Sequence, residues 1–181
     1  MYLDREKLEE TLLYIANKKP GMGFIQVFKI IFFAEEKHLA RHGRMIVGDK
    51  YIAMPRGPVP SHLYNVLRTL RGENNWVNVD IFSKRIEVVD HHFIYPKDIP
   101  NTDFLSKTDL ECLDESFEEN KDYGPWELSE KSHGTAWQSA ELNQTIDPIE
   151  MAIEAGASQE MVDYLRDKNG FENSLSHLSS E

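Results

Sequence analysis

The chain has a single cysteine, Cys112, among its 181 residues. One cysteine cannot form an internal disulfide, and it excludes a zinc site built from several thiolates. We therefore expect a reducing compartment, of which the cytoplasm is the simplest. No apolar run is long enough to span a bilayer, so we expect no membrane association, and the charged N-terminus lacks the features of a signal peptide.

Sequence patterns that carry catalysis or phosphate binding are also missing. Gly21-Met22-Gly23 has two glycines but lacks the rest of a dinucleotide-binding fingerprint. Ser129, Ser132 and His133 are close in sequence, but the Gly-x-Ser-x-Gly elbow of serine hydrolases does not accompany them. Cys112 has acidic neighbours, which suppress its thiolate form. The sequence therefore predicts no enzymatic activity and no cofactor.

One group of side chains suggests a metal site. Glu35 and His38 are three residues apart and His38 and His42 four, so a helix places all three on one face. Glu-x-x-His pairs bind di-metal centres in helical proteins, but those proteins carry a second copy on another helix, which this chain lacks. We favour a structural role, and a metal-binding protein or enzyme using these residues stays the alternative.

Acidic and basic residues are unevenly distributed along the chain. Residues 1–72 hold 12 basic and 7 acidic side chains, a net charge of +5, whereas residues 73–181 hold 8 and 24, a net charge of −16. Two interpretations stay open: the two parts attract each other within one fold, or an acidic face meets a basic protein. Nucleic acid is disfavoured as a partner, because no long basic stripe is present.

Hydrophobic periodicity and capping residues predict a mostly helical chain. The apolar residues between Phe24 and His42 cover most of a helix circumference, so this helix is expected at the centre of the core, with Gly43 ending it. The predicted helices run from Asp4 to Lys18, Phe24 to His42, Ser61 to Gly72, Thr108 to Gly124, Asp147 to Gly156 and Ser158 to near Gly170.

The middle of the chain predicts β-structure. We expect a hairpin from Met45 to Met54 that turns at Gly48-Asp49, and strands over 76–81, 86–89 and 93–95. Residues 55–60, which include three prolines, are expected to form a turn-rich connection instead of a central strand. Trp126 and Trp137 are interpreted as packing the C-terminal helices onto the sheet, and an exposed binding hot spot is the alternative.

Together these elements predict one α+β domain, mostly helical, with a small central antiparallel sheet. We place the domain at residues 1–171, of which 141–171 form a C-terminal helical extension. Residues 172–181 are Ser-rich and polar, which predicts a flexible tail.

Several segments occur in an informative order. They are Leu13 to Ala16, Lys29 to Leu39, Gly43 to Ile46, Tyr51 to Pro60 with its Gly-Pro-Val turn, and Leu63-Tyr64, followed by Leu128-Ser129, His133 and Trp137. This order resembles the SocA-like Panacea antitoxin domain, whose relatives include phage-associated proteins of the GepA type. The resemblance implies that Leu128, Ser129, His133 and Trp137 form a structural motif of the family. Arg56 departs from the family, which more often has a histidine before Gly-Pro-Val.

The resemblance implies an antitoxin that neutralises a cognate toxin by direct protein contact. The toxins of such families include alarmone-synthetase-like enzymes that block translation, and at least one relative is thought to deliver its toxin to the ClpXP protease. A stiff proline-rich turn loses little entropy on meeting a partner, and an acidic face steers a basic one. The predicted partner-binding residues are Arg56, Gly57, Pro58, Val59, Glu115 and Glu119.

Two further alternatives remain at this stage. The Gly-Pro-Val turn could serve the architecture alone, because turn residues are usually structural. The protein could also regulate its own gene by binding DNA, although no helix-turn-helix is clear. The basic side chains that could form a local patch are Lys29, Lys37, Arg41, Arg44, Arg56, Arg68 and Arg71.

Overall fold

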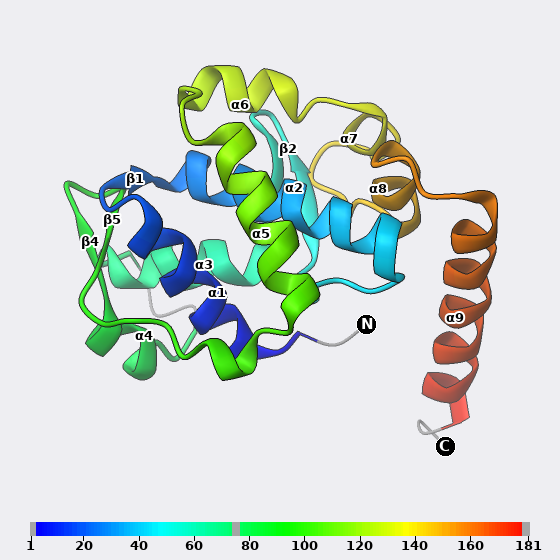
Figure 1. Cartoon of the computed structure of the whole chain (residues 1–181), viewed down its shortest axis with the longest axis horizontal. Helices are drawn as coiled ribbons and strands as arrows, with labels where there is room; N and C mark the ends of the chain where they lie inside the picture. Colours follow the sequence, from blue (N-terminus) through cyan, green and yellow to red (C-terminus); the bar gives the residue numbers. More distant parts are fainter. Residues whose placement is uncertain (1–2, 74–76, 179–181) are drawn as a thin grey trace.

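The computed structural model describes residues 3–73 and 77–178, the last ten of these by their backbone alone. It has the predicted class: one mostly helical α+β domain with small antiparallel sheets (Figure 1). The helices are α1 (Arg5–Lys18), α2 (Phe24–His42), α3 (Ser61–Leu70), α4 (Asp80–Arg85), α5 (Lys107–Asn120), α6 (Pro125–Lys131), α7 (Thr135–Gln138), α8 (Pro148–Glu154) and α9 (Gln159–Leu178), with a 3₁₀ turn η1 (Thr102–Phe104). None of these helices is long and apolar enough to cross a membrane.

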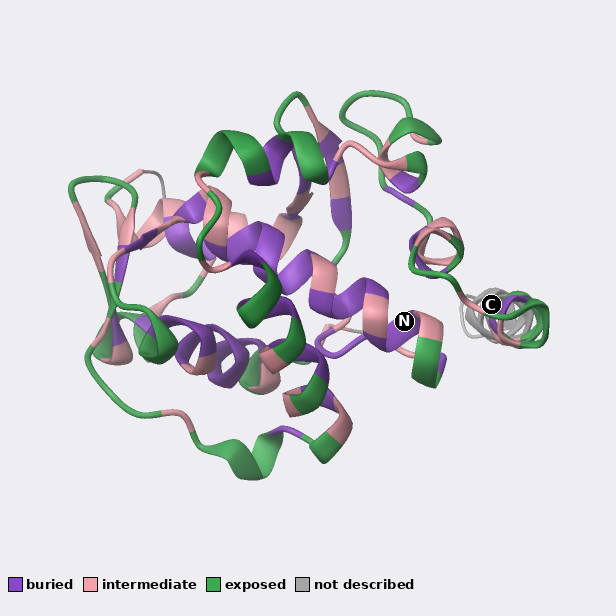
Figure 2. Ribbon diagram, turned by 45° about the horizontal axis from the view of Figure 1, so that its top comes forward, coloured by how far each residue is buried: buried purple, intermediate pink, exposed green. Residues whose placement is uncertain are grey.

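Helix α2 lies at the centre of the molecule, as the sequence predicts. It contacts α1, α5, α6, α8 and the strand that follows the Pro55-Arg56 turn, and its ribbon is largely buried (Figure 2). Its apolar side chains point in several directions, which suits a helix that is covered on several sides. Gly43 ends it in the left-handed conformation, with φ 64°.

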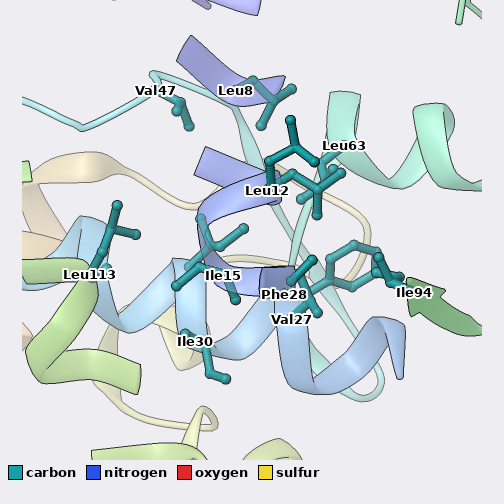
Figure 3. Close-up of a cluster of buried hydrophobic side chains, with 14 of the residues drawn as sticks. Leu8, Leu12, Ile15, Val27, Phe28, Ile30, Val47, Leu63, Ile94 and Leu113 are labelled. Carbon is teal, nitrogen blue, oxygen red and sulfur yellow. The ribbon is translucent and has the colours of Figure 1, made fainter. Parts of the chain in front are cut away.

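The larger hydrophobic cluster joins α1 to α2. In Figure 3, Ile15 of α1 lies near Val27 and Ile30 of α2, whereas Leu12 and Leu8, farther along α1, lie toward Leu63 and Val47. Other members come from α3, β5 and α5, and full burial of each such side chain contributes about 1.5–3 kcal/mol. A second cluster joins the far side of α2 to the hairpin and α8.

Two small antiparallel sheets flank this core. One has the order β1 (Met22–Gly23), β5 (Phe93–Pro96), β4 (Ile86–Val89), and the other pairs β2 (Tyr51–Met54) with β3 (Gly57–Pro60). Strands β4 and β5 confirm the predictions for their segments.

The predicted Met45–Met54 hairpin is wrong. The hairpin turns seven residues later, at Pro55-Arg56, with Met54 opposite Gly57 and Tyr51 opposite Pro60. Residues 55–60 are therefore partly a strand, because β3 pairs on one side only and an edge strand tolerates proline. Asp49 is not a turn residue: its carboxylate accepts hydrogen bonds from His62 N and Leu63 N, 3.0 Å each, and so caps α3 from a distance.

Other boundaries also differ from the predictions. Residues 77–79 form no strand and are followed by α4, while Trp76 lies outside the described residues. Helix α5 is capped by Ser106 and not by Thr108, because the Ser106 hydroxyl and the Asp109 carboxylate bond each other's backbone N–H. Helix α9 continues to Leu178, beyond its predicted end near Gly170. The flexible tail stays a prediction.

The segment after α7 is joined to the hairpin. Ala53 N donates to Gln144 O at 2.9 Å, and Ile146 N donates to Tyr51 O at 2.8 Å. The two bonds lie on β2, so the extension covers the edge of this strand that does not face β3. Helix α8 then packs on α2, and the first turns of α9 bring Tyr164 close to Gly43 at the end of α2.

Candidate partner-binding site

Three elements meet at Gly57, the first residue of β3. Its φ of 87° lies in the region that favours glycine. A Cβ placed there would lie 2.3 Å from Ser132 Oγ and 2.7 Å from Lys29 Nζ. The position therefore requires glycine for its backbone conformation and for the close approach of two neighbouring side chains.

Lys29 is the side chain that ties the central helix to this turn. It is 1% exposed, and its ammonium donates a hydrogen bond to Pro58 O at 2.7 Å. Burial lowers the pKa of Lys29 to about 7, since the charged form loses its hydration. The sequence offered one indication of this role, a single lysine inside the apolar run of α2.

The family-motif residues lie behind the same turn. Leu128 and Ser129 are buried in α6. The His133 ring packs on the Trp137 ring, with centroids 4.1 Å apart, and Trp137 Nε1 donates to Met54 O at 3.0 Å. These contacts hold α6 and α7 against β2 and fix the back of the hairpin.

In front of the turn lies a groove of about 750 Å³. Its walls come from the start of α2, the hairpin turn, α3, β5 and the start of α6. The residues that line it are Gly23, Phe24, Ile25, Gln26, Phe28, Lys29, Met54, Pro55, Arg56, Val59, Tyr64, Arg71, His92, Phe93, Pro125 and Trp126. Most are apolar, and the volume lies in the usual range for ligand sites.

Trp126 stands at the rim of this groove and is 66% exposed. The guanidinium of Arg56 lies over its ring, 4.8 Å from the centroid. The expectation that Trp126 packs onto the sheet is therefore wrong. Proline at the first position of α6 starts that helix next to the groove and leaves the following tryptophan facing solvent.

The predicted partner-binding residues thus separate into layers. Arg56 and Val59 line the groove, whereas the Pro58 carbonyl and Gly57 face the buried contacts behind it. Sequence reasoning missed Lys29, Arg71 and Trp126 as lining residues. Their contribution depends on chain segments far apart in the sequence, which only the fold brings together.

Glu115 and Glu119 lie elsewhere, on α5, and both are paired within the chain. Arg41 donates two hydrogen bonds to Glu115, at 2.8 and 2.7 Å, and Lys37 lies 2.8 Å from Glu119. The bonds from Arg41 lower the pKa of Glu115. Attraction between the basic and acidic parts of the chain, one of the two interpretations of its charge pattern, is therefore present between α2 and α5.

Two of the three candidate metal ligands, Glu35 and His38, bond the loop that follows α2. Glu35 is fully buried and accepts hydrogen bonds from Ile46 N and, at 3.0 Å, from Val47 N. Burial raises the pKa of its carboxyl to about 7. Among the described side chains, those of residues 3–73 and 77–168, no cluster of His, Cys, Asp and Glu has a metal-binding arrangement.

His38 is equally enclosed. Its Nδ1 bonds Arg44 O at 2.8 Å, and its Nε2 lies 3.0 Å from Thr108 Oγ1 and 3.1 Å from Asp109 Oδ1. Burial raises the pKa of the Asp109 carboxyl, but hydrogen bonds from His38, Lys7 and Ser106 outweigh it and leave the pKa below its ordinary value. The His42 ring packs against that of His38, 4.6 Å between centroids.

The basic side chains considered for DNA binding do not form a continuous surface. Lys29 is buried, Lys37 and Arg41 pair with α5, and Arg44 lies 2.9 Å from Asp109. Arg56 lies over Trp126, while Arg68 and Arg71 both contact Glu73.

Comparison with known proteins identifies the family. The model of the antitoxin SocA-like Panacea domain matches residues 27–138, which include most of α2, the hairpin, the groove rim and the motif residues of α6 and α7. No curated protein and no solved structure is significantly similar to the chain. The match covers more than half of the sequence, and the chain therefore belongs to the SocA-like Panacea antitoxin family.

Proposed function

We propose that the protein is an antitoxin that neutralises a cognate toxin by binding it directly. Membership of an antitoxin family supports a toxin partner in general. The Pro55–Val59 turn is the observation that favours neutralisation by direct contact. It lies inside the matched region and borders an apolar groove, and Lys29 and Ser132 pack behind it. A rigid, concave surface loses little conformational entropy on binding.

Binding, and not catalysis, is the proposed activity. Lys29, Ser132 and His133 lie near one another beneath Gly57 and are the nearest approach to a nucleophile with a base. Lys29 Nζ donates to Pro58 O, however, and Ser132 Oγ donates to Ser129 O at 2.8 Å. Both side chains are 1% exposed, so a substrate would have no access to them.

The proposed binding face is the groove with Arg56 and Val59 at its edge, held in place by Gly57 and Pro58. Glu115 and Glu119 remain a second proposed contact for a basic region of the toxin. Because Arg41 and Lys37 already neutralise part of their charge, we assign them the smaller share of the binding energy.

Co-expression with the protein encoded by the neighbouring gene tests this function. The expected result is that the neighbour alone stops growth, that this chain restores growth, and that the two co-purify with the toxin at unchanged abundance. A translation-blocking toxin would also show restored protein synthesis. Delivery to a protease such as ClpXP makes the opposite prediction, that the toxin disappears in cells with the protease and persists in cells without it. Rescue without a complex would contradict neutralisation by binding.

A further inference from the structure

The groove in front of the hairpin has a charge opposite to that of the chain. The whole sequence carries a net charge of −11, yet none of the described residues that line the groove is acidic. Two of them, Arg56 and Arg71, present guanidinium groups, whereas the amine of Lys29 is buried behind the turn. An acidic protein with a cationic groove presents, at that place, a surface complementary to anionic groups.

The two arginines differ in how far they are already engaged. In the part of the chain that the structure describes, Arg56 has no ion-pair partner, and its ring contact is with exposed Trp126. Arg71 lies 5.4 Å from the Phe24 ring centroid, pairs with Glu73 at 2.5 Å and donates to His91 O at 3.3 Å, and its side chain is 20% exposed. Arg56 is therefore the less engaged of the two cations, and Arg71 adds a second guanidinium to the groove lining.

Between these cations the groove is apolar. Phe24, Phe28, Val59, Tyr64 and Phe93 contribute to its lining, and the Phe28 and Tyr64 rings meet edge to face at 5.9 Å. Trp126 adds an exposed aromatic face at the rim. A small inorganic anion would use the cations and leave this aromatic surface uncovered. A peptide segment with an apolar side chain beside a carboxylate would use both.

We propose, on the basis of the proposed antitoxin function, that the groove binds an acidic segment of the toxin that carries an aromatic or large aliphatic side chain. The apolar side chain enters between Phe28, Tyr64 and Trp126. Neighbouring carboxylates meet the guanidinium groups of Arg56 and Arg71. This chemistry is the reverse of an acidic antitoxin face that meets a basic toxin, and it locates the main contact on the hairpin side of the molecule, with α5 as the smaller one.

A peptide selection, which does not require the toxin, tests which kind of peptide the groove binds. Random dodecapeptides displayed on phage are selected on the immobilised full chain. The groove variant combines Trp126→Ala with Arg56→Glu. The matched control combines Phe104→Ala with Arg166→Glu, which removes an exposed aromatic and reverses an exposed arginine away from the groove. Thermal melting of both variants checks that they are folded.

The expected result is enrichment of peptides that contain Asp or Glu next to Phe, Trp, Tyr or Leu. A synthetic copy of the most enriched peptide should bind the groove variant at least about tenfold more weakly than the wild type and the control variant. Enrichment of basic peptides, of apolar peptides without acids, or of no peptide would overturn the proposal. Equal binding to the groove variant would overturn it as well.

Toxin co-expression separates this inference from the function on which it rests. If wild type and the control variant restore growth and the groove variant does not, both proposals are supported. If the groove variant restores growth and binds the toxin as tightly as wild type, the inference fails and the antitoxin function stands. If wild type itself neither binds nor neutralises the neighbouring protein, the function fails, and the peptide selection alone decides what the groove binds.

Discussion

The two ends of helix α2 are built in opposite ways. At the C-terminal end the carboxylate of Glu35 and the imidazole of His38 are buried, and each is bonded to backbone or side chains of neighbouring loops. At the N-terminal end Phe24 and Phe28 border an open groove that the guanidinium groups of Arg56 and Arg71 also line. The polar end is closed and serves stability, whereas the apolar end is open and is the better candidate for binding.

This contrast also reverses the expectation raised by residue type. Glu35, His38 and His42 are the residues that a search for chemistry selects first, because carboxylate and imidazole groups bind metals. In the fold, Glu35 and His38 instead satisfy hydrogen bonds of the loop after α2. A polar group that is fully bonded within the protein has little left to offer a ligand, and the useful question is which donors remain free.

The largest expected effect comes from the closed end. Glu35→Ala removes the acceptor of two buried backbone N–H groups, at Ile46 and Val47, and should lower the free energy of unfolding by about 2–5 kcal/mol. Urea denaturation measures it. Exposed Glu111→Ala on α5 is the control and should change stability by no more than about 0.5 kcal/mol. Similar losses in the two variants would show that the Glu35 network is dispensable.

The next effect concerns the turn, where two glycines with nearly the same positive φ can be compared. Gly57 and Gly72 have φ of 87° and 88°, but a Cβ at Gly72 would meet nothing within 4 Å. Alanine at either position should cost about 1–3 kcal/mol through backbone strain. Gly57→Ala should cost about 1–3 kcal/mol more, because its methyl group meets Ser132 and Lys29.

Melting temperatures of the two variants measure the difference. Pro58→Ala, which mainly frees the unfolded chain, should cost only about 0.4–1 kcal/mol. Adding Ser132→Gly to Gly57→Ala should recover part of the loss, since it removes one of the two contacts. Equal losses for Gly57→Ala and Gly72→Ala would mean that the turn tolerates a side chain, and that it is held less tightly than the structure indicates.

A smaller, pH-dependent effect should arise from Lys29. Its pKa is about 7 in the folded chain and 10.5 ordinarily, so between these values the unfolded chain binds more protons and stability rises with pH. The Glu35 carboxyl has a pKa of about 7 in the folded chain instead of 4.5, so between these values it makes stability fall as pH rises. Above about pH 7 it changes the stability little. Urea unfolding at pH 7 and pH 9 should therefore show a gain of about 1–3 kcal/mol in the wild type.

The variant Lys29→Met tests whether Lys29 causes this gain in stability. Methionine keeps the apolar stem and removes the ammonium, so the gain between pH 7 and pH 9 should disappear. Lys37→Met, whose ammonium pairs on the surface with Glu119, is the control and should keep the gain. If the pH dependence of Lys29→Met equals that of the wild type, the Lys29 amine is charged in the folded protein.

The smallest effect is expected from the acidic surface of α5. Glu115→Lys with Glu119→Lys breaks exposed pairs with Arg41 and Lys37 and should cost about 1 kcal/mol or less. It should also slow toxin association modestly at low salt, because exposed charges are screened at high salt. Association rates at two salt concentrations measure this. A larger loss of toxin affinity than in the groove variant would place the main contact on α5.

Local sequence signals predicted the longer helices and strands β4 and β5, but missed α4, α6 and α7 and misplaced the hairpin. The limits of α2 follow from its own residues: an apolar run closed by Gly43. The hairpin was misplaced because the tolerance of β3 for Pro58 and Pro60 depends on its edge position, a property of the whole fold. Likewise, the side chain that caps α3 is that of Asp49, a dozen residues before Ser61, and only the fold brings it to the start of the helix.

The candidate site was predictable in part. The Arg56–Val59 turn stands out in the sequence because of its prolines and glycine. The groove does not, since its walls come from residues as distant as Phe24, Arg71 and Trp126. Residue type alone also misled at Trp126, because burial of a tryptophan depends on where the helix that carries it starts.

The pairing of residues 143–146 with β2 has a consequence for how the chain is made. The family match ends at residue 138, yet the Ala53 and Tyr51 backbone groups find their outer partners at Asn143, Gln144 and Ile146. During synthesis the hairpin emerges some ninety residues before the segment that covers it, and until then β2 presents unpaired backbone groups. Closing so long a loop is entropically costly and comes late in folding. A nascent chain stalled before Ile146 would hold the hairpin with one edge open, in a form prone to pair with other strands.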